Sequence, residues 1–143
     1  MIRLSWTVLC TRSSVDSESN NISLFEVLEQ LTLSAPPPGP GVVVFPHEVV
    51  SMWTRENLAE GGVAETRLVI VAPDNTRTEG PPINIDLTAF HRTRLRGRTP
   101  GLPVGAPGLY WIATEMRQGD GPAWIEVGRV PLEVRFGEVP LGA

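Results

Sequence analysis

The length and composition of this chain indicate one folded domain. Its 143 residues are 41% hydrophobic and 20% charged, which supplies enough apolar residues for one core and argues against disorder throughout. The net charge of −4 opposes a general attraction to nucleic acid or to anionic membranes, although it allows a local basic patch. We expect a single domain over residues 1–136, followed by a loosely held tail over residues 137–143.

The use of cysteine points to the cytoplasm. Cys10 is the only cysteine, so no intramolecular disulfide can form and folding does not need an oxidising compartment. The opening residues lack the apolar run of a signal peptide, and no stretch approaches the length of a membrane span. We therefore expect a soluble, cytoplasmic protein.

The first third of the chain reads as a strand, a turn and a second extended segment. From Ile2 to Cys10 apolar and polar residues alternate, which is the period of a strand with one buried face and places Cys10 on that face. The polar stretch 13–21 ends in two asparagines and predicts a hairpin loop. Between Ile22 and Leu33 the apolar parity changes, so this segment is either a bulged strand, which we favour, or a short helix.

The rest of the chain alternates short apolar runs with turns. Residues 35–41 hold four prolines and two glycines and form a stiff connector, used as a crossover or as a binding loop. Strands are predicted at residues 42–53 (kinked at Pro46), 63–72, 83–88, 109–113, 123–127 and 130–136, and a second Pro/Gly-rich loop at 97–108. Seven or eight strands without long helical patterns predict an all-β, antiparallel β-sandwich, immunoglobulin-like or C2-like.

Both ends of the chain resemble a family of small bacterial proteins of unknown function. The opening segment Trp6–Leu31, with its Trp-Thr-Val-Leu-Cys strand and polar loop, is similar to the start of that family. Pro-Gly-Leu-Tyr at residues 107–110 and Gly-Arg-Val-Pro-Leu at residues 128–132 are similar to its closing hairpin. The resemblance implies a cytoplasmic β-sandwich and supplies no functional residue.

No group of residues predicts catalysis or a cofactor. Cys10 would be a nucleophile only if His47 or His91 approached it as a base, and its inward position on a strand favours packing instead. The two histidines and the cysteine lack a zinc-ligand spacing, and the acidic loop residues, such as Asp74 and Asp86, lack a calcium-ligand spacing. We expect no enzyme activity, no cofactor and no metal site.

The most unusual local feature is a row of arginines. Arg92, Arg94, Arg96 and Arg98 occupy every second position, so on a strand they share one face. Such a row can bind carboxylates or phosphates through paired, planar hydrogen bonds. It can also simply keep a strand edge soluble and prevent aggregation. Among ligands, the acidic net charge and the shortage of nearby aromatics favour a protein over nucleic acid.

Two of the four tryptophans are candidates for an interface. Core packing is the default for most of the tryptophans. Trp53 and Trp124 lie closest to polar turns, so they are the best candidates for exposed anchors of an interface. Together with the arginine row and the rigid loops, they predict a non-enzymatic protein-interaction or assembly module that binds a protein partner or a second copy of itself. The alternatives are a nucleic-acid accessory protein that uses the arginine row, and a small hydrolase.

Overall fold

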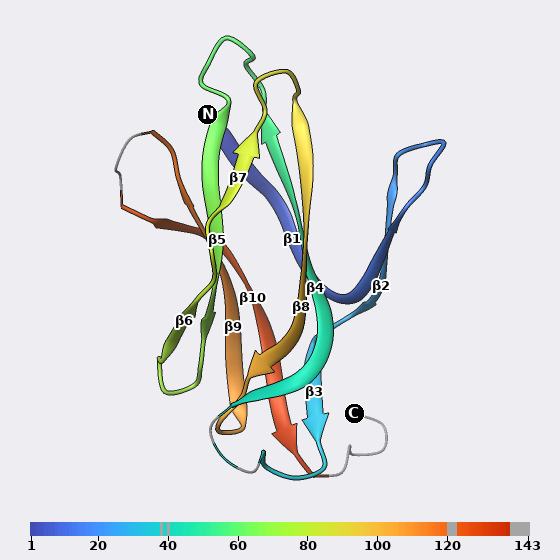
Figure 1. The fold of residues 1–143 in the computed structure, drawn as a ribbon, viewed down its shortest axis with the longest axis vertical. Helices are drawn as coiled ribbons and strands as arrows, with labels where there is room; N and C mark the ends of the chain where they lie inside the picture. The colour runs from blue at the N-terminus through green and yellow to red at the C-terminus, as the bar shows by residue number, and fades with distance from the viewer. Residues whose placement is uncertain (38, 40, 120–122, 138–143) are drawn as a thin grey trace.

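The computed structural model describes residues 1–37, 39, 41–119 and 123–137 and shows two β-sheets packed against each other (Figure 1). Its strands are β1 (Ile2–Val15), β2 (Ile22–Val27), β3 (Gln30–Leu33), β4 (Val42–Arg55), β5 (Val63–Val71), β6 (Arg77–Glu79), β7 (Ile83–Asp86), β8 (Arg92–Pro103), β9 (Gly108–Arg117) and β10 (Ile125–Phe136). The first sheet has the order β2-β1-β4-β8, and the second has the order β3-β10-β9-β5-β6, with β7 also paired to β5. All of these pairs are antiparallel except β3 with β10. The predicted all-β sandwich is confirmed.

The described part of the chain contains no helix long and apolar enough to cross a membrane. Residues 138–143 of the expected tail, and residues 38 and 40 of the proline-rich connector, lie outside the described residues.

The strands differ from the sequence prediction in number and in length. The structure describes ten strands where seven or eight were expected, and one addition is the three-residue β6. The loop predicted from residue 97 is wrong as far as Pro103, because β8 continues through Pro100. β8 lies at the edge of its sheet, so a proline that lacks an N–H need not interrupt the hydrogen bonds between strands.

The segment between Ile22 and Leu33 forms two strands that belong to different sheets. Glu26 has a positive φ of 52°, and the chain then turns from β2 in the first sheet to β3 in the second. Leu28 lies between the two strands, is buried, and donates its backbone N–H to the carbonyl of Leu9. Extended structure is therefore confirmed over the helix, but the expected single bulged strand is wrong, because the change of parity marks a crossing between sheets.

A register shift in β1 reverses the expected direction of Cys10. The pairing with β4 slips between Leu4 and Trp6, so the residues after the slip point to the opposite face from the one that simple alternation predicts. Ile2 and Leu9 both pack in the core between the sheets. Cys10 is buried on the other face of the sheet, directly opposite Glu48 on β4. The inward placement of Cys10 is thus wrong, although its burial is correct.

The core between the sheets has two parts. The larger part contains Leu9, Val49, Leu102, Tyr110, Ile112, Leu132 and Val134, and the smaller contains Ile2, Trp53, Ala64, Ile85 and Leu87. Each fully buried side chain of this size contributes about 1.5–3 kcal/mol. These contacts fix β4 and β8 against the second sheet and leave the β1–β2 hairpin to project from the side of the sandwich (Figure 1).

Candidate binding groove beside the arginine row

The arginine row lies on the outer face of the first sheet. Across the β4–β8 pair, Arg92, Arg94, Arg96 and Arg98 stand opposite Thr54, Met52, Val50 and Glu48 in that order. Leu95, which alternates with them, packs against the core instead. The four arginines therefore share one face of a strand, as the sequence pattern predicts.

One end of the row is held by a buried carboxylate. Arg98 Nε donates to Glu48 Oε1 at 2.9 Å, and Arg96 Nη2 lies 3.9 Å from the same oxygen. Glu48 is only 2% exposed. Burial raises the pKa of this carboxyl, but the hydrogen bond from Arg98 and the charges of Arg98 and Arg96 outweigh burial, so the pKa is lowered.

The middle of the row holds the β1–β2 hairpin through neutral acceptors. Arg94 Nη2 donates to the backbone oxygen of Asn20 at 2.8 Å and to its side-chain oxygen at 2.9 Å. Arg96 donates from Nε to Ser13 Oγ at 2.7 Å and from Nη2 to the Ser13 carbonyl at 3.0 Å. Arg92 forms no side-chain hydrogen bond within the described residues. At one end of the row, Arg98 is thus paired with a carboxylate, whereas at the other end Arg92 has no hydrogen-bond partner among the described residues.

A groove opens between the hairpin and the first half of β8. This arginine groove has a volume of about 660 Å³ and is lined by Val15, Asn20, Phe90, His91, Arg92, Thr93, Arg94 and Arg96. Phe90 is 66% exposed. Asp16 accepts backbone N–H groups from Glu18 and Ser19 and so fixes the turn that brings Asn20 to Arg94.

The hairpin side of this groove could not be predicted from the sequence. The polar loop signalled a turn, but nothing in the residues shows that the hairpin reaches β8, which is more than seventy positions away in the chain. The role of Glu48 could not be predicted either, because nothing in the sequence distinguishes this glutamate from an ordinary surface carboxylate.

The structure does not assemble the candidate thiol site. Cys10 is fully buried, and burial, followed by the nearby charge of Glu48, raises the pKa of its thiol. His47 Nδ1 donates to the carbonyl of Phe45 at 2.8 Å, and His91 Nδ1 donates to that of Arg55 at 3.0 Å. Neither histidine is hydrogen-bonded to Cys10, so the geometry offers no activated thiol.

Acidic residues in the loops serve local turns. Asp74 accepts the N–H of Thr76, and Asp86 accepts both the N–H and the hydroxyl of Thr88. These bonds lower the pKa of each carboxyl. Over the ranges that the structure describes, no three residues among His, Cys, Asp and Glu are grouped so that they could hold a metal ion.

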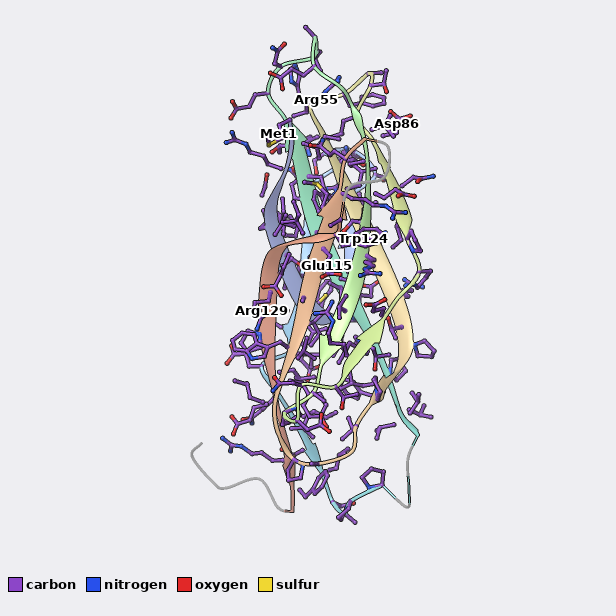
Figure 2. The ribbon with its side chains drawn as sticks, turned by 90° about the vertical axis from the view of Figure 1, so that its left-hand side faces the viewer. Met1, Arg55, Asp86, Glu115, Trp124 and Arg129 are labelled. Atoms are coloured by element: carbon purple, nitrogen blue, oxygen red, sulfur yellow. The ribbon has the colours of Figure 1, made fainter. Side chains whose placement is uncertain are left out.

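The two tryptophans proposed as anchors have different environments. Trp53 is fully buried and donates Nε1 to Ser51 Oγ at 2.9 Å, so the prediction of an exposed anchor is wrong for Trp53. Its inward position on β4, beside Ile2, accounts for the burial. Trp124 lies on the outer face of the second sheet, near Glu115 (Figure 2).

Trp124 is covered from two sides by arginines. The guanidinium carbons of Arg67 and Arg117 lie 4.5 Å and 4.4 Å from its ring centroid. Arg67 also donates to Glu115, and Arg117 to Glu65, so the two cations are already paired. Trp124 is half-buried in this arrangement. Contacts within the chain are therefore enough to explain its position, and no partner protein is needed to account for it.

Comparisons with known proteins identify no family. No family model matches the chain, and no curated protein matches it. Among solved structures, it is similar to an alkylpurine DNA glycosylase AlkC from Pseudomonas fluorescens bound to DNA, with 7% identity and a TM-score of 0.48 over 94% of this chain and 30% of that one. It is also similar to a beta-glucosidase from Listeria innocua in complex with isofagomine, with 14% identity and a TM-score of 0.47 over 94% of this chain and 17% of that one. Likeness at this level carries no argument about function.

Proposed function

We propose that this protein is a non-enzymatic interaction module that binds an acidic segment of a partner protein at the arginine groove. The observation that carries the proposal is the charge imbalance of the row. Across the β4–β8 pair, four guanidinium groups face a single carboxylate, that of Glu48. Arginine forms paired, planar hydrogen bonds to carboxylates, so the three remaining arginines are well suited to acidic side chains.

The contacts of Arg94 and Arg96 support the same proposal. Arg94 donates to Asn20 and Arg96 donates to Ser13, and these acceptors carry no charge. A carboxylate adds an attraction between opposite charges that these neutral oxygens cannot offer to the guanidinium groups. A carboxylate that enters the groove therefore competes well for these donors, and the hairpin does not block the site.

Phe90 adds an apolar contact at the rim of the groove. It is among the most exposed large hydrophobic side chains of the described residues, and it lies two positions before Arg92. Exposed aromatics beside arginines are the usual centres of protein interfaces. We infer that Phe90 packs on the partner while the arginines bind its acidic groups.

Nucleic acid is the second candidate ligand, because guanidinium groups also bind phosphates. The net charge of −4 opposes it. Phe90 and His91 are the only rings among the groove residues, which is little for stacking bases. The hydrolase alternative has no support in the geometry around Cys10. We place the module in the cytoplasm, because its single cysteine is buried and needs no disulfide.

Fluorescence anisotropy with labelled probes tests the proposal. The probes are a peptide of Glu, Ser and Leu, its counterpart with Lys in place of Glu, and single-stranded and duplex DNA of mixed sequence. We expect binding of the acidic peptide alone. The double variant R92A/R94A should raise its Kd by about tenfold or more, because two charged contacts are lost.

The matched control is R129A/R135A, which removes two charges from β10 on the second sheet. It should leave the Kd within about twofold, because neither residue lines the groove and charges outside it are screened at physiological salt. Equal losses in both double variants would mean that net charge, and not the groove, attracts the peptide. Binding of DNA without the acidic peptide would replace the proposal with the nucleic-acid alternative.

A further inference from the structure

β8 is an edge strand with one open side. In the first sheet it pairs with β4, and no other described strand pairs with it. An edge strand presents unpaired N–H and C=O groups, which can pair with a strand from another chain. Pro100 and Pro103 remove donors from the second half of β8, whereas residues 92–99 contain no proline. The part of the edge that can accept a strand is therefore the part that carries the arginines.

The arginine groove extends to this open edge. Arg92 and Arg94 point to the outer face, Thr93 points to the other face, and all three line the groove. On the inner side of the edge, Leu95 and Ile83 of β7 line one small space between the sheets. Ile83 is 38% exposed there. An added strand would thus meet charge on one face and apolar surface on the other.

The β4–β8 pair already shows which side chain fits beside these arginines. Glu48 stands directly opposite Arg98 and accepts its Nε–H at 2.9 Å. The other three arginines face Thr54, Met52 and Val50, none of which carries a charge. Opposite charges on neighbouring strands stabilise a sheet, and like charges destabilise it. Arg96 reaches Glu48 only at 3.9 Å, so a closely bound carboxylate for these three arginines can come only from a strand on the open side or from above the sheet.

We propose that the partner's acidic segment binds as an added β-strand along residues 92–99 of β8, with acidic side chains at every second position on the outer face. Its alternate side chains are small or apolar and lie over Leu95 and Ile83. This inference rests on the function proposed above and specifies the conformation and the sequence pattern of the partner. A second copy of the same edge is disfavoured, because it would set one arginine row beside another.

The test compares peptides of identical composition on the unmodified protein. In the first peptide, Glu alternates with Val or Thr, and in the second the same residues are grouped into an acidic block and an apolar block. Two further versions of the first peptide carry N-methyl groups on one or the other set of alternate amides. In an added strand one set of amides bonds to β8 and the other points away.

We expect the alternating peptide to bind about tenfold more tightly than the grouped one. N-methylation of one amide set should abolish binding, and N-methylation of the other should change it by less than about twofold. Backbone amide exchange over residues 92–99 should slow in the complex. Equal binding of all four peptides would overturn the added strand and leave the proposed function standing, whereas no binding of any acidic peptide would overturn both.

Discussion

Replacing Glu48 with glutamine tests how the buried carboxylate holds the arginine row. A hydrogen bond to a charged group contributes about 1.5–3 kcal/mol. The Arg98 side chain that donates it is 77% exposed, so solvent screens the interaction. A neutral amide is also cheaper to bury than a carboxylate. We expect E48Q to lose about 1 kcal/mol of unfolding free energy, which lowers Tm by about 3 °C in a chain of this size.

The loss of stability in E48Q should disappear at acid pH. A carboxyl with a pKa that is lower in the folded state than in the unfolded state stabilises the fold above the unfolded value, about 4.3 for glutamate. Its contribution is lost as the pH falls through the folded pKa, and that pKa is lowered for Glu48. Protonated glutamate resembles glutamine, so the two proteins should converge in stability once the pH falls below the folded pKa of Glu48. Urea unfolding at neutral and acid pH measures both differences.

The same variant should bind the acidic peptide more tightly. Without the Glu48 charge, Arg98 becomes available and the field of the row strengthens, so we expect the Kd to fall by about threefold. The control is E115Q, which removes a buried carboxylate that accepts hydrogen bonds from Arg67 and Arg77 on the second sheet. It should lose stability in the same pH-dependent way without a change in binding. An E48Q protein that is more stable than the wild type at neutral pH, or a difference that persists in acid, would refute this reasoning.

Three further predictions concern the fold. In G101A the new Cβ would clash with Val42 Cγ1 and with the backbone oxygen of Val43, so we expect a loss of about 1–3 kcal/mol in urea unfolding. In G105A the new Cβ would meet no atom within 4 Å, so this variant should stay within about 0.5 kcal/mol of wild type. Cys10 should react with a thiol reagent only in denaturant, because it is buried and its pKa is raised; fast reaction of the native protein would contradict its position. W53A should lose about 3–5 kcal/mol, measured by thermal unfolding, and a loss below about 1 kcal/mol would show that Trp53 is not in the core.

Alternation and turn residues were enough to predict the class of fold. The sandwich follows from short apolar runs with a period of two, and Asn20 forms the hairpin turn with a positive φ of 59°. The faces were harder to assign, because the slip between Leu4 and Trp6 reverses every later residue of β1. A one-residue slip leaves no trace in composition, so the direction of Cys10 could not be predicted.

Only part of the candidate site could be predicted from the sequence. The arginine row is local, and a strand of period two places it on one face without further information. Its partners Glu48, Ser13 and Asn20 come from distant parts of the chain and meet the row through strand order and the curl of the hairpin. Trp53 shows the same limit, because a position near a polar turn does not reveal which face of β4 it occupies.

The contacts along the row predict an order for the energetic contribution of each arginine to partner binding. Arg92 has no internal partner to give up, Arg94 gives up neutral acceptors of Asn20, and Arg98 would have to share the carboxylate of Glu48. Because the net gain from a new carboxylate is smaller when a stronger bond is lost, alanine substitution should weaken acidic-peptide binding most at Arg92 and Arg94 and least at Arg98. Peptide titrations of the single variants measure this order. Equal effects at all positions would indicate attraction by the summed field of the row, and the largest effect at Arg98 would indicate that the partner approaches from the Glu48 end.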